Sequence, residues 1–279
     1  PGRWGEKVVL RALESDNSVL NLSKLVTEKN ELKLIQNMSN SPYGIVIVVG
    51  PTGSGKSTTL YSMLSELNKP GVNISTVEDP VEYTLDGIHQ VQVLREKGLD
   101  FSRALRSLMR QDPDIILVGE TRDKETAQAA MEAALTGHMV FTTLHANDTA
   151  TAITRLAEME IPPYLIGASI IGLVAQRLVR KVCKSCSELR NLNAKEDSLA
   201  LNLGVKKARF LKGTNRNCTI CNGTGYKGRI GIYEVMKVND KIRELIMKES
   251  NAEEIREFAF ERQGRSLLVY GMNLVKQEL

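Results

Sequence analysis

The 279-residue sequence lacks any long apolar run. No segment approaches the ~18 consecutive apolar residues that a membrane-spanning helix needs. No signal peptide, internal repeat or low-complexity tract is visible, and the missing signal peptide favours an intracellular protein. The chain also lacks an initiating methionine, which predicts a fragment of a longer protein. Hydrophobic residues make up 42% and charged residues 25%, the usual balance of a globular protein with a buried core.

Cysteine is also scarce, and its placement is informative. Only four cysteines occur, and they form the pairs Cys183-x₂-Cys186 and Cys218-x₂-Cys221 within a basic segment. Two such pairs can present four thiolates to one tetrahedral ion, which predicts a closed structural Zn²⁺ site. An iron–sulfur centre and four unrelated thiols are the alternatives. The polar, lysine-rich stretch between the pairs has few apolar residues, so metal binding would supply its missing stability.

The most informative stretch runs from Ile45 to Leu60 and reads I-V-I-V-V-G-P-T-G-S-G-K-S-T-T-L. It predicts a buried strand, a glycine loop and a helix beginning near Ser57, the context in which G-x-x-x-x-G-K-S binds phosphate. Glycines permit close backbone approach, and N–H groups at a helix N-terminus attract anions. Lys56 would reach the β- and γ-phosphates, and Ser57 would hold Mg²⁺. The predicted nucleotide-binding residues are Gly50, Pro51, Thr52, Gly53, Ser54, Gly55, Lys56, Ser57 and Thr58.

After this loop, strand-like and helix-like stretches alternate, which predicts a parallel sheet covered by helices on both faces. The predicted strands after the loop are 72–77, an exposed strand at 88–94, 115–118 and 139–144. The predicted helices are 101–109, 124–135, 149–158, 164–174, 240–247 and 252–260.

Two acidic residues and one histidine follow predicted buried strands, at the sheet edge where open α/β sheets bind ligands. Glu120 follows strand 115–118 and is predicted to serve Mg²⁺, whereas Glu78 follows strand 72–77 and would orient or deprotonate a water. A surface salt bridge is the alternative for either glutamate. His145 ends strand 139–144, level with the loop, where it would donate to a γ-phosphate. His138 should lie at the opposite end.

Four long motifs together resemble the type II secretion and type IV pilus assembly ATPases. The phosphate loop, S-T-V-E-D-P-V-E, L-R-S-L-M-R-Q-D-P-D-I-I-L-V-G-E-T-R-D and T-G-H-M-V-F-T-T-L-H-A-N-D are similar to that family's Walker A, Asp-box, Walker B and His-box motifs, in order. The resemblance runs from about Gly5 to the C-terminus. It implies a RecA-like α/β P-loop NTPase with a mostly parallel sheet, a small tetracysteine zinc module and C-terminal helices. The implied units are the tail of a preceding domain (1–30), the ATPase core (31–180), the Cys₄ module (181–225) and a mainly helical C-terminal subdomain (226–279).

The resemblance also implies residue roles. Glu78 matches the family's catalytic base and Glu120 its Mg²⁺-serving Walker B acid. Catalytic or subunit-coupling arginines are implied at Arg11, Arg106, Arg110 and Arg122, and Arg229 in the motif after the cysteines is placed near the adenine. Because secretion and pilus-extension members carry a tetracysteine motif that retraction ATPases generally lack, the cysteines favour the former two.

The implied function is a Mg²⁺-dependent ATPase that acts as a homo-hexameric motor on a platform protein of the cytoplasmic membrane. It would be cytoplasmic and peripheral at the membrane's inner face, and secretion and pilus extension stay unseparated. A nucleic-acid translocase is the main alternative, but the basic segment offers few aromatics for base stacking, essentially Phe210 and Tyr226. Attraction to an anionic membrane or an acidic partner explains the basic charge more simply. A GTP switch is disfavoured because Asn68-Lys69-Pro70-Gly71 lacks the aspartate of a guanine-reading motif.

Overall fold

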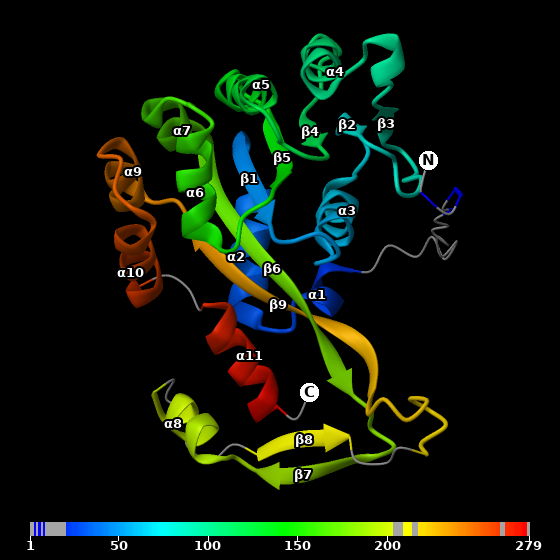
Figure 1. Ribbon diagram of the computed structural model, residues 1–279. Coiled ribbons are helices and arrows are strands. Elements are labelled where there is room, and N and C mark those ends of the chain that lie inside the picture. The colour runs from blue at the N-terminus through cyan, green and yellow to red at the C-terminus, as the bar shows by residue number, and fades with distance from the viewer. Residues whose placement is uncertain are drawn as a thin grey trace.

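A seven-stranded sheet forms the centre of the protein in a computed structural model, which describes residues 3, 5, 6, 8, 21–202, 209–213, 217–262 and 266–277 (Figure 1). The strand order is β3-β2-β4-β5-β1-β6-β9, and only the β6–β9 pairing is antiparallel. The mostly parallel α/β fold is therefore confirmed. The strands are β1 (Gly44–Val49), β2 (Ile74–Glu78), β3 (His89–Gln92), β4 (Ile115–Val118), β5 (Met139–Leu144), β6 (Ile170–Val182) and β9 (Tyr226–Lys237).

Helices cover both faces of this sheet because its central strands are apolar on both sides. Along β1, Ile45, Ile47 and Val49 enter one hydrophobic cluster, whereas Val46 and Val48 enter the other. The first cluster is completed by α4 (Phe101–Leu108), α5 (Lys124–Leu135), α6 (Thr149–Glu158), α7 (Pro163–Ser169), α9 (Asp240–Met247) and α10 (Ala252–Arg262). The second is completed by α1 (Leu22–Leu25), α2 (Lys29–Ser39), α3 (Lys56–Leu67) and α11 (Leu267–Lys276).

Aspartate caps start the helices that follow β4 and β5. The Asp123 carboxylate accepts the N–H of Thr126 at the start of α5, and Asp148 accepts the N–H of Thr151 at the start of α6. These caps hold the strand-to-helix loops at the carboxyl edge of the sheet, where the predicted site residues lie.

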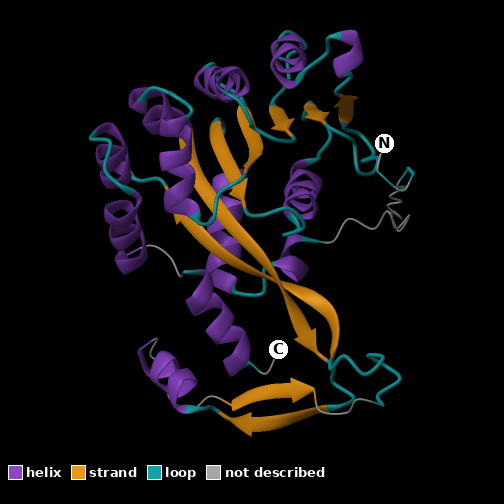
Figure 2. Ribbon diagram, viewed as in Figure 1, coloured by secondary structure: helices purple, strands orange, loops and turns teal. Residues whose placement is uncertain are grey.

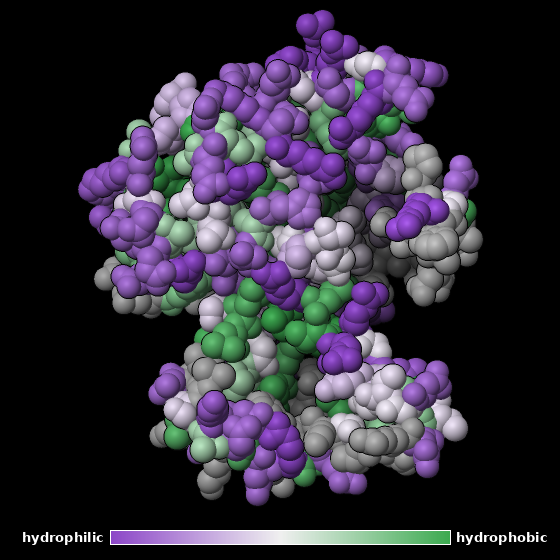
Figure 3. Space-filling model, in the orientation of Figure 1, coloured by the Kyte–Doolittle hydropathy of each residue, from purple (hydrophilic) through white to green (hydrophobic). Residues whose placement is uncertain are grey.

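A two-stranded arm leaves the sheet. β6 pairs with β1 as far as Ala175 and then continues with β9 alone to Val182. The arm leads to a small module of β7 (Ser187–Asn191), α8 (Ala194–Asn202) and β8 (Arg209–Gly213), below the main body in Figure 2. Figure 3 shows apolar surface gathered where the arm joins the body to this module.

The predicted helix over 164–174 is wrong beyond Ser169. The structure ends α7 at Ser169 and begins β6 at Ile170, which pairs with Ile45 of β1. A short apolar run such as 170–174 fits either a buried helix or a buried strand. It forms a strand here because β1 pairs with β5 on one side only, and its other side accepts β6. The structure also places β9 in the main sheet, although its residues fall within the predicted C-terminal unit.

Two further predictions concern the chain's beginning and the membrane. Arg11, which the resemblance implies as a catalytic or subunit-coupling arginine, lies outside the described residues. Over the described ranges, no helix combines the length and apolarity needed to cross a bilayer.

Candidate nucleotide site and cysteine centre

The glycine loop between β1 and α3 has backbone torsions that favour glycine. Gly50, Gly53 and Gly55 have φ values of 153°, 75° and 88°. A Cβ on Gly50 would lie 2.5 Å from the carbonyl oxygen of Gln176, so a side chain has no room there. Within the described part of the chain, no side chain caps the N-terminus of α3. Its first N–H groups are therefore suited to an anion, and the loop fits a phosphate chain.

A cavity of about 560 Å³ lies over this loop, at the carboxyl ends of β2, β4 and β5. The loop contributes Thr52, Gly53, Gly55, Lys56, Ser57 and Thr58 to its lining. The strand ends contribute Glu78, Glu120, Arg122 and His145. The structure thus brings together six of the nine predicted phosphate-binding residues, both predicted acids, one predicted arginine and the predicted histidine.

Lys56 folds back onto the loop. Its Nζ donates to the carbonyl oxygens of Gly50, at 2.9 Å, and of Pro51, at 3.1 Å. Burial lowers the pKa of Lys56, and the charge of Glu120 opposes that shift. A phosphate oxygen would offer this ammonium a charged acceptor in place of two neutral carbonyls.

Glu120 lies between the side chains of Arg122 and His145. Its Oε2 is 2.5 Å from Arg122 Nη2, and its Oε1 is 2.7 Å from His145 Nε2. A hydrogen bond from the guanidinium to Glu120 raises the pKa of Arg122. Because the Glu120 carboxylate and the Ser57 hydroxyl line one cavity, they provide the oxygen donors that Mg²⁺ prefers.

Two of the three histidines, His138 and His145, lie at opposite ends of β5. His145 is in the cavity, whereas the His138 carbonyl accepts from Gly44 N–H at the start of β1, and the ring Nδ1 lies 2.8 Å from the Ala133 carbonyl oxygen. His138 therefore has a structural place at the far edge of the sheet, and His145 has the predicted place near the loop.

Glu78 is buried, with 4% of its surface exposed, and accepts three side-chain hydrogen bonds. The donors are Tyr61, Thr76 and Gln90. None of the three was expected at the site, because Tyr61 and Thr76 have residue types that are ordinary for a buried helix and strand. Gln90 was the one polar signal, in a strand predicted to be exposed.

Gln176 is a second residue that the sequence did not reveal. Its side chain is 2% exposed, and its Oε1 accepts from Thr59 Oγ1 at 2.8 Å. Since Thr59 lies on α3 and the Gln176 carbonyl oxygen abuts Gly50, β6 supports the loop and its helix together. The available sequence signal was a glutamine at the end of an apolar run, because a buried amide needs hydrogen-bond partners.

Several predicted residues do not line the cavity. Arg106 is exposed on α4, and Arg110 lies beyond the end of that helix. Arg229 is on the arm, opposite Arg180 of β6. The residues absent from the lining are Gly50, Pro51, Ser54, Arg106, Arg110 and Arg229.

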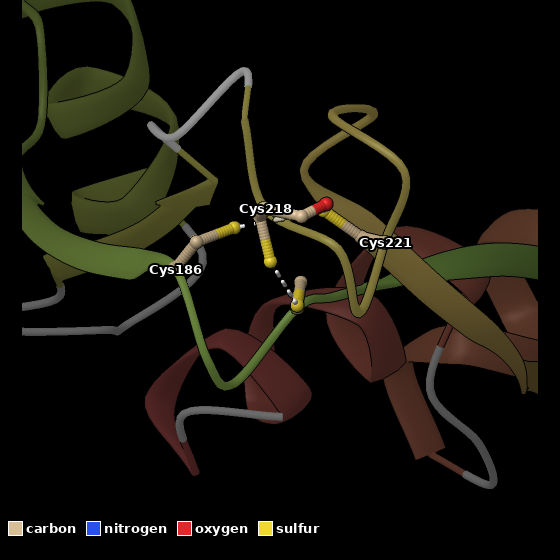
Figure 4. A group of neighbouring side chains, drawn as sticks. Cys186, Cys218 and Cys221 are labelled. Atoms are coloured by element: carbon tan, nitrogen blue, oxygen red, sulfur yellow. Dashed lines mark hydrogen bonds between the residues drawn. The ribbon is translucent and has the colours of Figure 1, made fainter.

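The four cysteines converge beyond the tip of the arm (Figure 4). All four Sγ atoms lie within 4.8 Å of one another, with Cys183 Sγ 4.0 Å from Cys218 Sγ and Cys186 Sγ 3.7 Å from Cys221 Sγ. Sulfur atoms at ~2.3 Å from a tetrahedral Zn²⁺ are about 3.8 Å apart. The cluster therefore fits a closed zinc site, as its spacing predicts.

Hydrogen bonds lower the pKa of one of these thiols, Cys221. Burial raises the pKa of Cys221, but the N–H of Gly225, 3.2 Å from its Sγ, and the neighbouring thiols outweigh burial and lower it to about 7. A thiolate is the form that binds metal.

Comparison with known proteins agrees with this geometry. A family described as type II/IV secretion system protein matches residues 1–279. The type II secretion system protein E of Pseudomonas aeruginosa is 44% identical and covers all of this chain and 56% of its own length. The type IV pilus assembly ATPase PilB of Myxococcus xanthus is 45% identical, with 98% of this chain and 48% of its own covered.

Solved structures are similar over most of the chain. The ATPase DotB of Legionella pneumophila has a TM-score of 0.66 and 25% identity, with 93% of this chain and 62% of its own covered. The pilus retraction motor PilT with bound ADP has a TM-score of 0.63 and 26% identity, with 93% and 68% covered. The chain spans about half the length of the two curated relatives above. By family match, identity and fold, it belongs to the type II/IV secretion system protein family and has the RecA-like fold of the secretion and pilus ATPases.

Proposed function

We propose that this chain hydrolyses ATP and is the motor part of a type II secretion or type IV pilus assembly ATPase. The observation that carries the proposal is that Lys56, Glu78 and Glu120 meet in one cavity, at the carboxyl ends of β1, β2 and β4. Burying a carboxylate is costly unless it is hydrogen-bonded or paired, and carboxylates held in this way beside a phosphate loop, here Glu78 and Glu120, are typical of a functional site. The family relationship supports the same activity.

The residues divide the work of hydrolysis. The loop would bind the phosphates through its N–H groups and Lys56. Glu78 would accept a proton from the attacking water or orient it. His145 would donate a hydrogen bond to the γ-phosphate, and Arg122 would provide positive charge beside it. Ser57 and Glu120 would hold Mg²⁺, which when bound neutralises phosphate charge.

The larger assembly is also proposed. We expect a homo-hexameric ring that acts on a platform protein at the inner face of the cytoplasmic membrane, as the resemblance to the secretion and pilus assembly ATPases implies. Zn²⁺ would be held by Cys183, Cys186, Cys218 and Cys221 as a structural ion, since four thiolates leave no open position. The surrounding basic segment would face an anionic membrane or an acidic partner.

The activity is tested with two conservative variants of the intact protein. Glu78→Gln and Glu120→Gln should both bind ATP and fail to hydrolyse it, as measured by ATP titration and phosphate release. Normal turnover in either variant would remove that residue from its role. Strong stimulation of the wild-type ATPase by DNA or RNA would instead favour a nucleic-acid translocase.

A further inference from the structure

The Glu78 carboxylate is held by donors from three elements. Thr76 Oγ1 of β2 donates to Oε1 at 2.6 Å, and Gln90 Nε2 of β3 donates to the same oxygen at 3.1 Å. The Tyr61 hydroxyl of α3 donates to Oε2. Thr76 is 0% and Tyr61 is 1% exposed, so water does not compete for these bonds. The carboxylate is therefore fixed on both of its oxygens.

The direction of the tyrosine bond is set by its second partner. The N–H of Glu82 donates to the Tyr61 oxygen at 3.3 Å, which leaves the phenol proton for Glu78. Burial, followed by the hydrogen bond and charge of Glu78, raises the pKa of Tyr61, so this side chain stays protonated and remains a donor. The Tyr83 ring packs edge-on against it, with centroids 4.6 Å apart, and restricts its movement.

The count of acceptor sites limits what Glu78 can still do. An ionised carboxylate has about four lone-pair sites, two on each oxygen. Thr76 and Gln90 occupy Oε1, and Tyr61 occupies one site of Oε2. Among the described residues nothing else donates to the Glu78 carboxylate, so one site on Oε2 stays available, and it belongs to a residue that lines the nucleotide cavity.

The tyrosine also links this base to the phosphate loop. Tyr61 lies five residues after Lys56 on the same helix, α3. The group that would contact phosphate and the group that holds the base are therefore on one rigid element. Their separation is set by helix geometry rather than by a loop.

We infer that Tyr61 and Thr76 are positioning residues for ATP hydrolysis: their hydroxyls orient Glu78 so that its one remaining acceptor site receives the attacking water. This inference rests on the proposed ATPase function. Both residues act through Glu78 and neither needs to touch ATP. Loss of either hydroxyl should therefore lower kcat and leave the affinity for ATP unchanged.

Matched substitutions test the hydroxyls rather than the packing. Tyr61→Phe keeps the ring, Thr76→Val keeps the shape, and Thr76→Ser keeps the donor. Because hydrogen bonds to charged groups are strong, Tyr61→Phe and Thr76→Val should each lower kcat by about 10-fold to 100-fold, with KM for ATP within about twofold of wild type. Thr76→Ser should keep kcat within about threefold of wild type, the extent expected when the donor remains.

The control is Tyr270→Phe on α11. Tyr270 is also fully buried, and its hydroxyl accepts the N–H of Thr27 and of Glu28. None of these three residues lines the nucleotide cavity. It should lose stability in a thermal melt and keep its kcat. Phosphate release by the intact protein is measured at saturating and limiting ATP for every variant.

The outcomes separate this inference from the proposed function. If Glu78→Gln is inactive but Tyr61→Phe and Thr76→Val keep kcat within about twofold, the positioning role is refuted and the ATPase proposal stands. A Thr76→Ser variant as slow as Thr76→Val would also refute it, because packing rather than the donor would then matter. If Glu78→Gln hydrolyses ATP normally, the base assignment fails first. Should Tyr61→Phe not fold, the two Thr76 variants decide alone.

Discussion

A single methyl group added to Gly213 should weaken metal binding without touching a cysteine. A Cβ on Gly213 of β8 would lie 2.4 Å from both the Cα and the carbonyl oxygen of Gly225. These are backbone atoms, so neither can rotate away. Gly225 in turn donates its N–H to Cys221 Sγ and accepts the N–H of Cys183, at 2.9 Å, so displacing it disturbs both cysteine pairs.

The size of the effect follows from this clash. Overpacking by one methyl group costs about 1–3 kcal/mol. If that cost falls on the metal-bound form, Gly213→Ala should bind Zn²⁺ about 5-fold to 150-fold more weakly than wild type. Competition with a chromophoric chelator, performed on the intact protein, measures the two affinities.

The control for this experiment is Gly271→Ala on α11. No described residue lies within 4 Å of the position of a Cβ at Gly271, and alanine suits a helix better than glycine does. Its Zn²⁺ affinity should match that of wild type. Zinc affinity of Gly213→Ala within about twofold of wild type would show that the β8 contact does not support the cysteine centre, and the reasoning would be refuted.

Three further substitutions test a buried glutamate, the packing of the sheet and the phosphate loop. Burial raises the pKa of Glu234 above its unfolded value of 4.5, so its contribution to stability is greatest below that value and is lost as pH rises. Glu234→Gln should therefore reduce the difference between the unfolding free energies measured in urea at about pH 5 and about pH 7. The same difference in the variant as in wild type would contradict this. Gly172→Ala should lower the free energy of unfolding by about 1–3 kcal/mol, because its Cβ would lie 2.0 Å from Met38 Sδ. Adding Met38→Ala should relieve that clash, and strictly additive losses would exclude it. Lys56→Ala should weaken ATP binding at least about tenfold in calorimetry, whereas unchanged affinity would place it outside the phosphate site.

Sequence patterns predicted the central strands and their helices well. The strands at 115–118 and 139–144 and the helices at 124–135 and 149–158 have the predicted bounds. Each of these apolar runs lies between clear turn or cap residues, so its pattern fits one kind of element only. The run at 170–174 fits both a helix and a strand. It forms a strand because it pairs with β1, more than 100 residues earlier in the chain.

The same limit applies to the site. Glu78, Glu120 and His145 could be placed because each follows a recognisable strand. The donors to Glu78 were not identified. Thr76 lies two residues before it, on the same face of β2, but a threonine is ordinary in a strand, and Tyr61 lies on another element, so its contact with Glu78 depends on tertiary packing. Residue type predicts which groups can react, and tertiary packing decides which groups hold them.

The arm formed by β6 and β9 connects the two candidate sites. Its near end includes Gln176, which contacts the phosphate-loop helix, and its far end at Val182 leads directly to Cys183. At ~3.3 Å per residue, residues 176–182 span about 20 Å, paired with β9 and no longer with β1. One continuous strand therefore joins the helix of the phosphate loop to the cysteine centre over about 20 Å.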